Sequence, residues 1–135
     1  MSIMTWNESW KIGIGALDNE HRDCFQLLDD IHTAVKENDA GVHDGRLLRM
    51  LYDRVRAHFA AEEALMVGDR YPGVAIHAMK HEHLAKQLLA LIARVERAPT
   101  NLNEHALKFL LDWFQTHLVQ EDRAFGVWLN EHGKY

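Results

Sequence analysis

The chain has 135 residues, of which 47% are hydrophobic and 26% charged, and its formal net charge is −5. These values are typical of one soluble globular domain over residues 1–135 and argue against disorder and against nucleic acid as a partner. No apolar run reaches the roughly 18 residues that a membrane-spanning helix needs, so we expect no membrane insertion. A single cysteine, Cys24, and the absence of a signal-like N-terminus predict a cytoplasmic protein.

Turn signals divide the chain into an N-terminal arm and four helical segments. Residues 1–17 predict an extended arm that packs on the rest of the domain. Apolar residues at helical spacing then predict helices over about 18–37, 44–67, 72–97 and 101–129. Asn101, followed three residues later by Glu104, is typical of a capping box at the start of the last helix. The linkers are short, so the sequence predicts an all-α, antiparallel up-down-up-down four-helix bundle.

Polar side chains interrupt the apolar stripes of all four predicted helices. They occupy positions that helical periodicity directs into the bundle: His21, His58, Glu62, His77, His81 and His117. Burying such groups without partners costs on the order of several kcal/mol each, a cost that metal coordination offsets. Two of the pairs, His58 with Glu62 and His77 with His81, have the i,i+4 spacing that places both side chains on one helix face.

Asp122 fits this set only if its helix is irregular. It follows His117 by five residues, which on a regular helix is about 140° off the same face. We therefore predict a π-type turn between the two residues, because a regular helix would direct Asp122 to solvent. The remaining histidines are interpreted as surface or capping residues, and Glu63 is predicted to point away from Glu62; these histidines are His32, His43, His83, His105 and His132.

Neutral imidazoles with two carboxylates suit iron, zinc, copper or nickel. One cysteine excludes a thiolate-rich zinc site. Seven candidate ligands are too many for one ion, so the pattern indicates two ions bridged by carboxylates.

The order of these motifs resembles that of bacterial hemerythrins, members of the hemerythrin-like family. The pieces that carry the resemblance are DNEH at 18–21, HFAAEE at 58–63, HAMKH at 77–81 and WFQTHLVQED at 113–122, and the match covers nearly the whole chain. The resemblance implies a non-haem centre of two iron ions (Fe2+/Fe3+) with an oxo or hydroxo bridge. It implies His77, His81 and His117 as ligands of one iron, His21 and His58 as ligands of the other, and Glu62 and Asp122 as bridges. The second iron would keep an open position for dioxygen, and the candidate lining of the oxygen pocket is Phe25, Phe59, Trp113 and Phe114.

Two residues depart from the family's usual pattern. Glu20 stands where Gln commonly precedes the first histidine, and we expect it to face outward with little effect. Phe114 stands where Leu commonly follows the tryptophan of the last helix. Its larger ring, at a position resembling one that lines the oxygen pocket, predicts slower movement of oxygen or better shielding from water.

The resemblance implies reversible dioxygen binding for transport or storage. The alternatives are an oxygen or redox sensor and a di-iron oxidase or peroxidase. Oxygen-activating ferritin-like bundles use Glu-x-x-His motifs, and none occurs in this chain, which argues against an enzyme. We expect no attached signalling domain, which argues against a sensor. The sequence shows no apolar seam beyond the core, so we expect a monomer.

Overall fold

The computed structural model describes residues 8–37, 45–98 and 102–133. A short 3-10 turn, η1 (Glu8–Trp10), precedes three long helices: α1 (Gly15–Lys36), α2 (Arg46–Gly68) and α3 (Val74–Arg97). The fourth helix of the bundle consists of α4 (Glu104–His117), a π-helical turn η4 (Leu118–Asp122) and α5 (Arg123–Glu131). Within the described ranges there is no β-strand. The predicted all-α four-helix bundle is confirmed.

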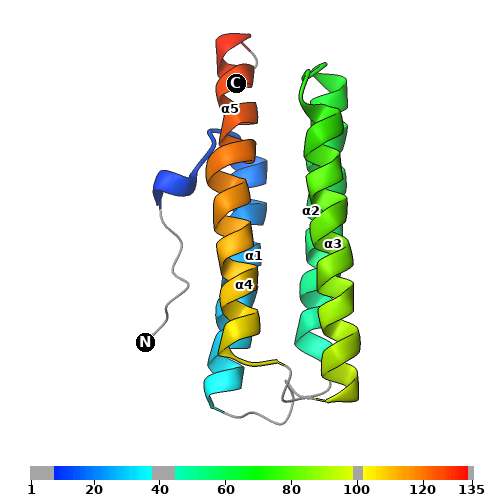
Figure 1. Ribbon diagram of the computed structural model, residues 1–135. Coiled ribbons are helices and arrows are strands. Elements are labelled where there is room, and N and C mark those ends of the chain that lie inside the picture. Colours follow the sequence, from blue (N-terminus) through cyan, green and yellow to red (C-terminus); the bar gives the residue numbers. More distant parts are fainter. Residues whose placement is uncertain (1–7, 38–44, 99–101, 134–135) are drawn as a thin grey trace.

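The helices stand side by side with alternating direction (Figure 1). The pairs in closest contact are α1 with α2, α2 with α3, and α1 with α4. Each long helix buries one apolar stripe, which accounts for the bundle, since a stripe at a period of 3.6 residues must be covered by neighbouring helices. Among the fully buried side chains are Leu28 and Ile31 of α1, Leu48 and Leu51 of α2, Leu84 and Leu88 of α3, and Leu110 of α4.

The N-terminal segment packs on the bundle, although it is not wholly extended. Residues 8–10 form η1, and Gly15 to Leu17 already belong to α1. Ile12 and Ile14 are buried, and the Ile12 amide donates to the Asp18 carboxylate at 2.8 Å, which ties the segment to the first turn of α1. It also crosses α5 closely, because a Cβ added at Gly126 would lie 2.3 Å from the carbonyl oxygen of Ile12. Residues 1–7 of the predicted arm lie outside the described residues.

The start of the fourth helix differs from the prediction. The residue that caps α4 is Asn103, whose side chain accepts a hydrogen bond from the Ala106 amide at 3.1 Å. The predicted capping box at Asn101 is therefore wrong, and Asn101 itself lies outside the described residues. Asparagine is a preferred N-cap residue, so the residue type alone does not distinguish Asn101 from Asn103. Glu104, predicted as the third residue of the helix, is instead its first residue.

The predicted irregularity between His117 and Asp122 is confirmed, since residues 118–122 form a π-helical turn. A π-turn adds a residue to one helical turn, so side chains five apart share a face. Among the described residues, no helix combines the length and apolarity that a bilayer crossing requires.

Candidate metal centre

Seven buried polar side chains meet in the interior of the bundle. They form two overlapping groups whose potential ligand atoms lie within 4.8 Å of one another in each group. The first group is Glu62, His77, His81, His117 and Asp122, and the second is His21, His58, Glu62 and Asp122. All seven residues that the sequence analysis selected are thus brought together, from α1, α2, α3, α4 and η4.

The two shared carboxylates each direct one oxygen to each group. Glu62 Oε1 lies 2.6 Å from His77 Nε2 and 3.3 Å from His81 Nε2. Glu62 Oε2 lies 3.5 Å from His21 Nε2 and 3.3 Å from His58 Nε2. The arrangement is that of a carboxylate bridge between two neighbouring cation positions.

Asp122 repeats the same division. Its Oδ1 lies 2.8 Å from His77 Nε2 and 3.0 Å from His117 Nε2, whereas its Oδ2 lies 3.1 Å from His21 Nε2. On the side of the three histidines, His81 Nε2 and His117 Nε2 are only 2.9 Å apart. The π-turn makes this geometry possible, because it brings Asp122 onto the face of His117.

The cluster fits metal ions better than it fits a closed set of hydrogen bonds. His21 Nε2 and Glu62 Oε2 are fully buried and make no well-aligned hydrogen bond within the described part of the chain. Buried polar atoms are nearly always satisfied, so such orphans need an explanation. Five imidazoles and two carboxylates are a donor set that first-row transition metals accept, and each group offers enough donors for one ion.

Without metal, the centre holds protons. Burial opposes a charge on His58, but its hydrogen bonds to Glu20 and Glu62 outweigh burial and raise its pKa from 6.5 to about 9. The pKa of His77 rises from 6.5 to about 9 as well, since Asp122 and Glu62 outweigh burial. The same contacts hold the pKa of Glu62 well below 4.5 despite burial. A metal ion bound at Nε2 must therefore displace protons, as metal sites of this kind require.

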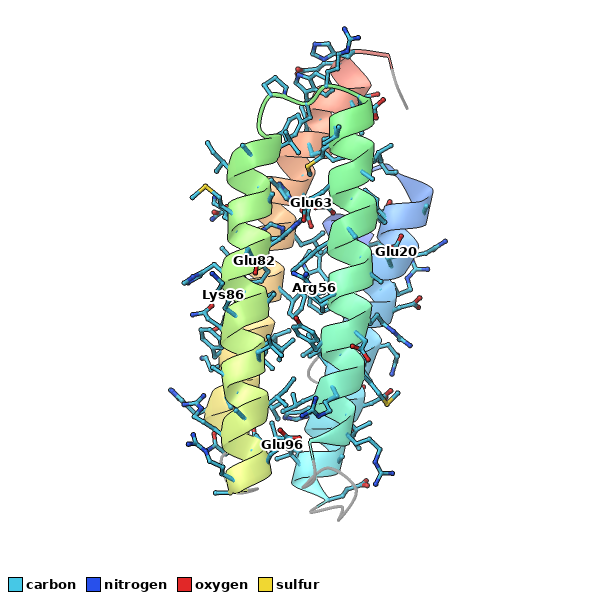
Figure 2. All side chains as sticks on the ribbon, turned by 90° about the vertical axis from the view of Figure 1, so that its right-hand side faces the viewer. Glu20, Arg56, Glu63, Glu82, Lys86 and Glu96 are labelled. Atoms are coloured by element: carbon cyan, nitrogen blue, oxygen red, sulfur yellow. The ribbon has the colours of Figure 1, made fainter. Side chains whose placement is uncertain are left out.

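Two glutamates beside the cluster lie differently from the prediction. Glu20, expected to face outward with little effect, has Oε1 3.1 Å from His58 Nδ1. Glu63, expected to point away from Glu62, is not among the clustered ligand candidates, but its Oε2 lies 2.8 Å from His81 Nδ1. Figure 2 shows Glu63 between α2 and α3, and Glu20 at the side where α1 meets α2. Their i,i+1 spacing from a ligand was a poor guide, because each reaches a histidine on the neighbouring helix.

The candidate pocket aromatics form two sets around the cluster. Phe59 stacks on His81 with ring centroids 3.7 Å apart, and Trp113 stacks on His117 at 4.8 Å. Phe25 and Phe114 meet edge to face at 6.4 Å, and Trp10 covers the other side of Phe25 at 4.7 Å. Phe25, Phe59 and Phe114 are buried. Phe59 and Trp113 therefore each cover one ring face of a cluster imidazole.

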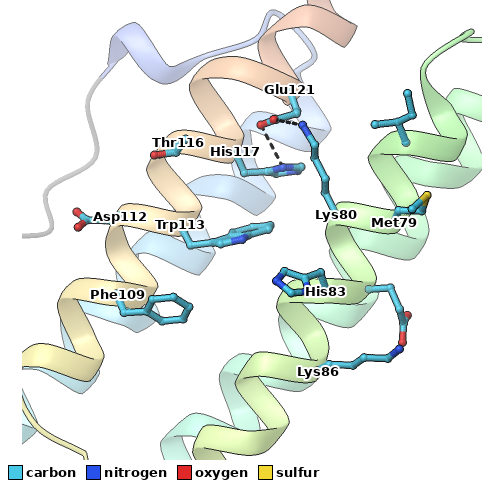
Figure 3. A pocket seen from close by; sticks show the side chains of 12 residues that line it. Met79, Lys80, His83, Lys86, Phe109, Asp112, Trp113, Thr116, His117 and Glu121 are labelled. Atoms are coloured by element: carbon cyan, nitrogen blue, oxygen red, sulfur yellow. Dashed lines mark hydrogen bonds and ion pairs between the residues drawn. The ribbon is translucent and has the colours of Figure 1, made fainter.

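Outside Trp113 and His117, a groove of about 1000 Å³ separates α3 from α4. Figure 3 shows both side chains reaching from α4 toward Lys80 and His83 of α3, with Lys80 paired to Glu121. Ile76 and Met79 expose 65% and 72% of their surface at this groove. The sequence analysis missed this apolar surface, because these residues lie outside the core stripes.

The other histidines among the described residues do not enter the cluster. His83 is exposed, as predicted, and His132 Nδ1 lies 2.7 Å from the carbonyl oxygen of Trp128, a capping contact. The surface assignment of His32 is wrong: it is buried, with Nε2 3.4 Å from a Glu104 carboxylate oxygen. The partner comes from α4, and a pattern within α1 does not reveal it. His105 is exposed, and His43 lies outside the described residues.

The structure is a four-helix bundle with a buried cluster of side chains suited to hold two neighbouring metal ions. Residues 12–129 match the hemerythrin HHE cation binding domain, so the chain belongs to the hemerythrin family. The resemblance seen in the sequence is thereby confirmed. Membership of this family implies a di-iron, oxygen-binding type of domain.

Known relatives match along most of the chain. The bacteriohemerythrin of Methylococcus capsulatus (strain Bath) is 27% identical over 132 residues, which cover 96% of this chain and 99% of that protein. Myohemerythrin-1 of Phascolopsis gouldii is 28% identical over 117 residues, which cover 87% of each. The crystal structure of a wild-type hemerythrin superposes with a TM-score of 0.84 at 25% identity and covers 93% of this chain and 96% of its own.

Proposed function

We propose that the chain binds dioxygen reversibly, for transport or storage, at a centre of two iron ions with an oxo or hydroxo bridge. The observation that carries this proposal is the division of Glu62 and Asp122, each with one oxygen toward each group of histidines. When bound, the two irons would supply two electrons that dioxygen can accept and return. The residues of the chain would hold the ions, set their spacing and exclude water.

The proposed ligands divide unevenly. His77, His81 and His117 would serve one ion, and His21 and His58 the other, with Glu62 and Asp122 common to both. The ion with one histidine fewer would have room for a small ligand that its neighbour would lack. The uneven division therefore supports binding of dioxygen at the ion of His21 and His58.

The proposed oxygen pocket consists of the aromatic rings around the cluster. Phe114 lies against Phe25, which is one helical turn from His21 on α1. Phe59 and Trp113 cover the three-histidine side by stacking on His81 and His117. This apolar enclosure suits dioxygen, which is small and uncharged, and it keeps bulk water from the centre.

A binding protein fits these features better than an enzyme does. The ligand set is rich in imidazole and contains two carboxylates, whereas oxygen-activating bundles use a set rich in glutamate.

The test is the visible spectrum of the iron-loaded, anaerobically reduced protein as air is admitted and then removed. We expect a visible absorption band that grows with oxygen and disappears when oxygen is stripped, over repeated cycles. A matched variant, Glu62→Gln, should bind fewer irons and show no such band. Irreversible oxidation in the first cycle would refute reversible oxygen binding and favour an oxidase, a peroxidase or a redox sensor.

A further inference from the structure

Three histidines of the cluster have a carboxylate behind them. Their Nε2 atoms face Glu62 or Asp122, and their Nδ1 atoms face outward toward a second acid. The distances from Nδ1 are 3.1 Å for His58 to Glu20, 2.8 Å for His81 to Glu63, and 3.5 Å for His117 to Glu121. The two shorter contacts are hydrogen bonds in which the carboxylate can only accept, so a neutral His58 or His81 ring keeps its proton on Nδ1 and turns its Nε2 lone pair inward. His117 Nδ1 makes no hydrogen bond to a described residue.

Each proposed ion has one histidine with a hydrogen-bonded outer acid. On the three-histidine side this acid is Glu63, behind His81, whereas Glu121 lies 3.5 Å from His117 Nδ1 and is paired with Lys80. The two-histidine side has Glu20 behind His58, whereas His21 Nδ1 is buried without a hydrogen bond to any described residue. Glu20 therefore holds the better-oriented of the two histidines at the ion that would bind dioxygen.

Glu20 acts between helices. It lies next to His21 on α1, yet its side chain reaches His58 on α2 and remains 36% exposed (Figure 2). Its carboxylate is therefore open to solvent on one side and in contact with His58 on the other.

We propose that Glu20 is a positioning residue for the ion of His21 and His58, and that its charge makes His58 a stronger donor than a glutamine at this place would. The inference rests on the proposed function, since it assumes that two ions bind. The hydrogen bond orients the ring, and the negative charge behind Nδ1 increases the electron density at Nε2. A more electron-rich ligand favours the higher oxidation state of its ion.

The first test separates orientation from charge by metal binding alone. Cobalt(II) is titrated into the metal-free protein in competition with a chelator, for the wild type, Glu20→Ala and Glu20→Gln. Loss of an outer partner of a metal-bound histidine typically lowers metal affinity by roughly 10–100-fold. Glu20→Ala should therefore weaken binding of the ion at His21 and His58 by about that factor. Glu20→Gln should retain most of the affinity, because its amide oxygen accepts from Nδ1.

The matched control is Asp23→Ala, which removes one negative charge from the exposed side of the same helix, three residues away. It should leave both affinities at the wild-type value. Circular dichroism melting shows whether each variant is folded, and Glu20 lies at the surface of the bundle rather than in its core. Equal affinities for Glu20→Ala and Asp23→Ala would overturn the positioning role.

The second test measures the charge. The reduction potential of the iron-loaded protein should rise in Glu20→Gln and remain unchanged in Asp23→Ala. Nitrogen NMR of the zinc-loaded protein should show His58 protonated at Nδ1 in the wild type and in Glu20→Gln. An unchanged potential in Glu20→Gln would refute the electronic part. A wild-type protein that binds fewer than two ions would instead refute the proposed function, so the two failures are distinguishable.

Discussion

After removal of the metal, the free energy of unfolding should fall as the pH rises above neutrality. In the metal-free protein the pKa of His58 and that of His77 each lie at about 9, against 6.5 before the fold adds its effects. A raised pKa means that the folded state holds the proton more tightly than the unfolded chain does. The stabilisation is therefore fully present below pH 6.5, and it is lost as the pH rises through about 9.

The magnitude follows from the difference between the two pKa values. A rise from 6.5 to about 9 corresponds to about 3 kcal/mol for one histidine, at roughly 1.36 kcal/mol per pKa unit. His58 and His77 share Glu62 as a partner, so their contributions do not add fully. On the acid side, the lowered pKa of Glu62 stabilises the fold above pH 4.5, and that stabilisation is lost as the pH falls. The metal-free protein should therefore be most stable between about pH 4.5 and pH 6.5.

The assay is urea unfolding of chelator-treated protein, followed by far-ultraviolet circular dichroism at pH 6 and pH 9.5. The free energy of unfolding should be about 3 kcal/mol lower at pH 9.5, with the same dependence on urea. His83→Gln, which removes an exposed histidine outside the cluster, should show the same profile as the wild type. The loaded protein should not lose stability over this range, because metal binding needs neutral imidazoles. Equal or greater stability of the metal-free protein at pH 9.5 would refute the reasoning.

Three further predictions concern single side chains. Glu62→Gln should lower the metal content below two ions per chain, measured by mass spectrometry, since each of its oxygens faces a different group; two tightly held ions would contradict the bridge. Phe114→Leu should speed oxygen dissociation or autoxidation in stopped-flow and spectral decay, and unchanged rates for both would exclude a role in the pocket. Gly126→Ala should cost about 1–3 kcal/mol in urea unfolding, because the new Cβ would meet the Ile12 carbonyl oxygen at 2.3 Å; wild-type stability would show that the N-terminal segment moves freely.

Periodicity within one helix predicted the inward face of the centre. His58, Glu62, His77 and His81 each follow the core spacing of their own helix, so their direction could be deduced from the sequence. Asp122 also could be placed, because its offset from His117 allowed only a π-turn or exclusion from the site. These are local properties, determined by residues a few positions apart.

The outward face depends on contacts between helices, which periodicity does not encode. Glu20 and Glu63 are polar residues on exposed stripes, where most carboxylates contact only water. Their partners lie 38 and 18 residues away in sequence. The burial of His32 by α4 was missed for the same reason. The start of α4 was misplaced because two asparagines two residues apart can both cap a helix, and tertiary packing selects between them.

The stacking of Trp113 on His117 gives the protein a built-in optical signal. An indole 4.8 Å from an imidazole of the candidate metal centre would lie within reach of quenching by a bound transition-metal ion, whereas Trp128 lies on α5 against His132, which is no part of the cluster. Emission from Trp113 should therefore report whether the three-histidine position is filled. Loading, loss and exchange of metal could then be followed in the unlabelled chain by fluorescence alone.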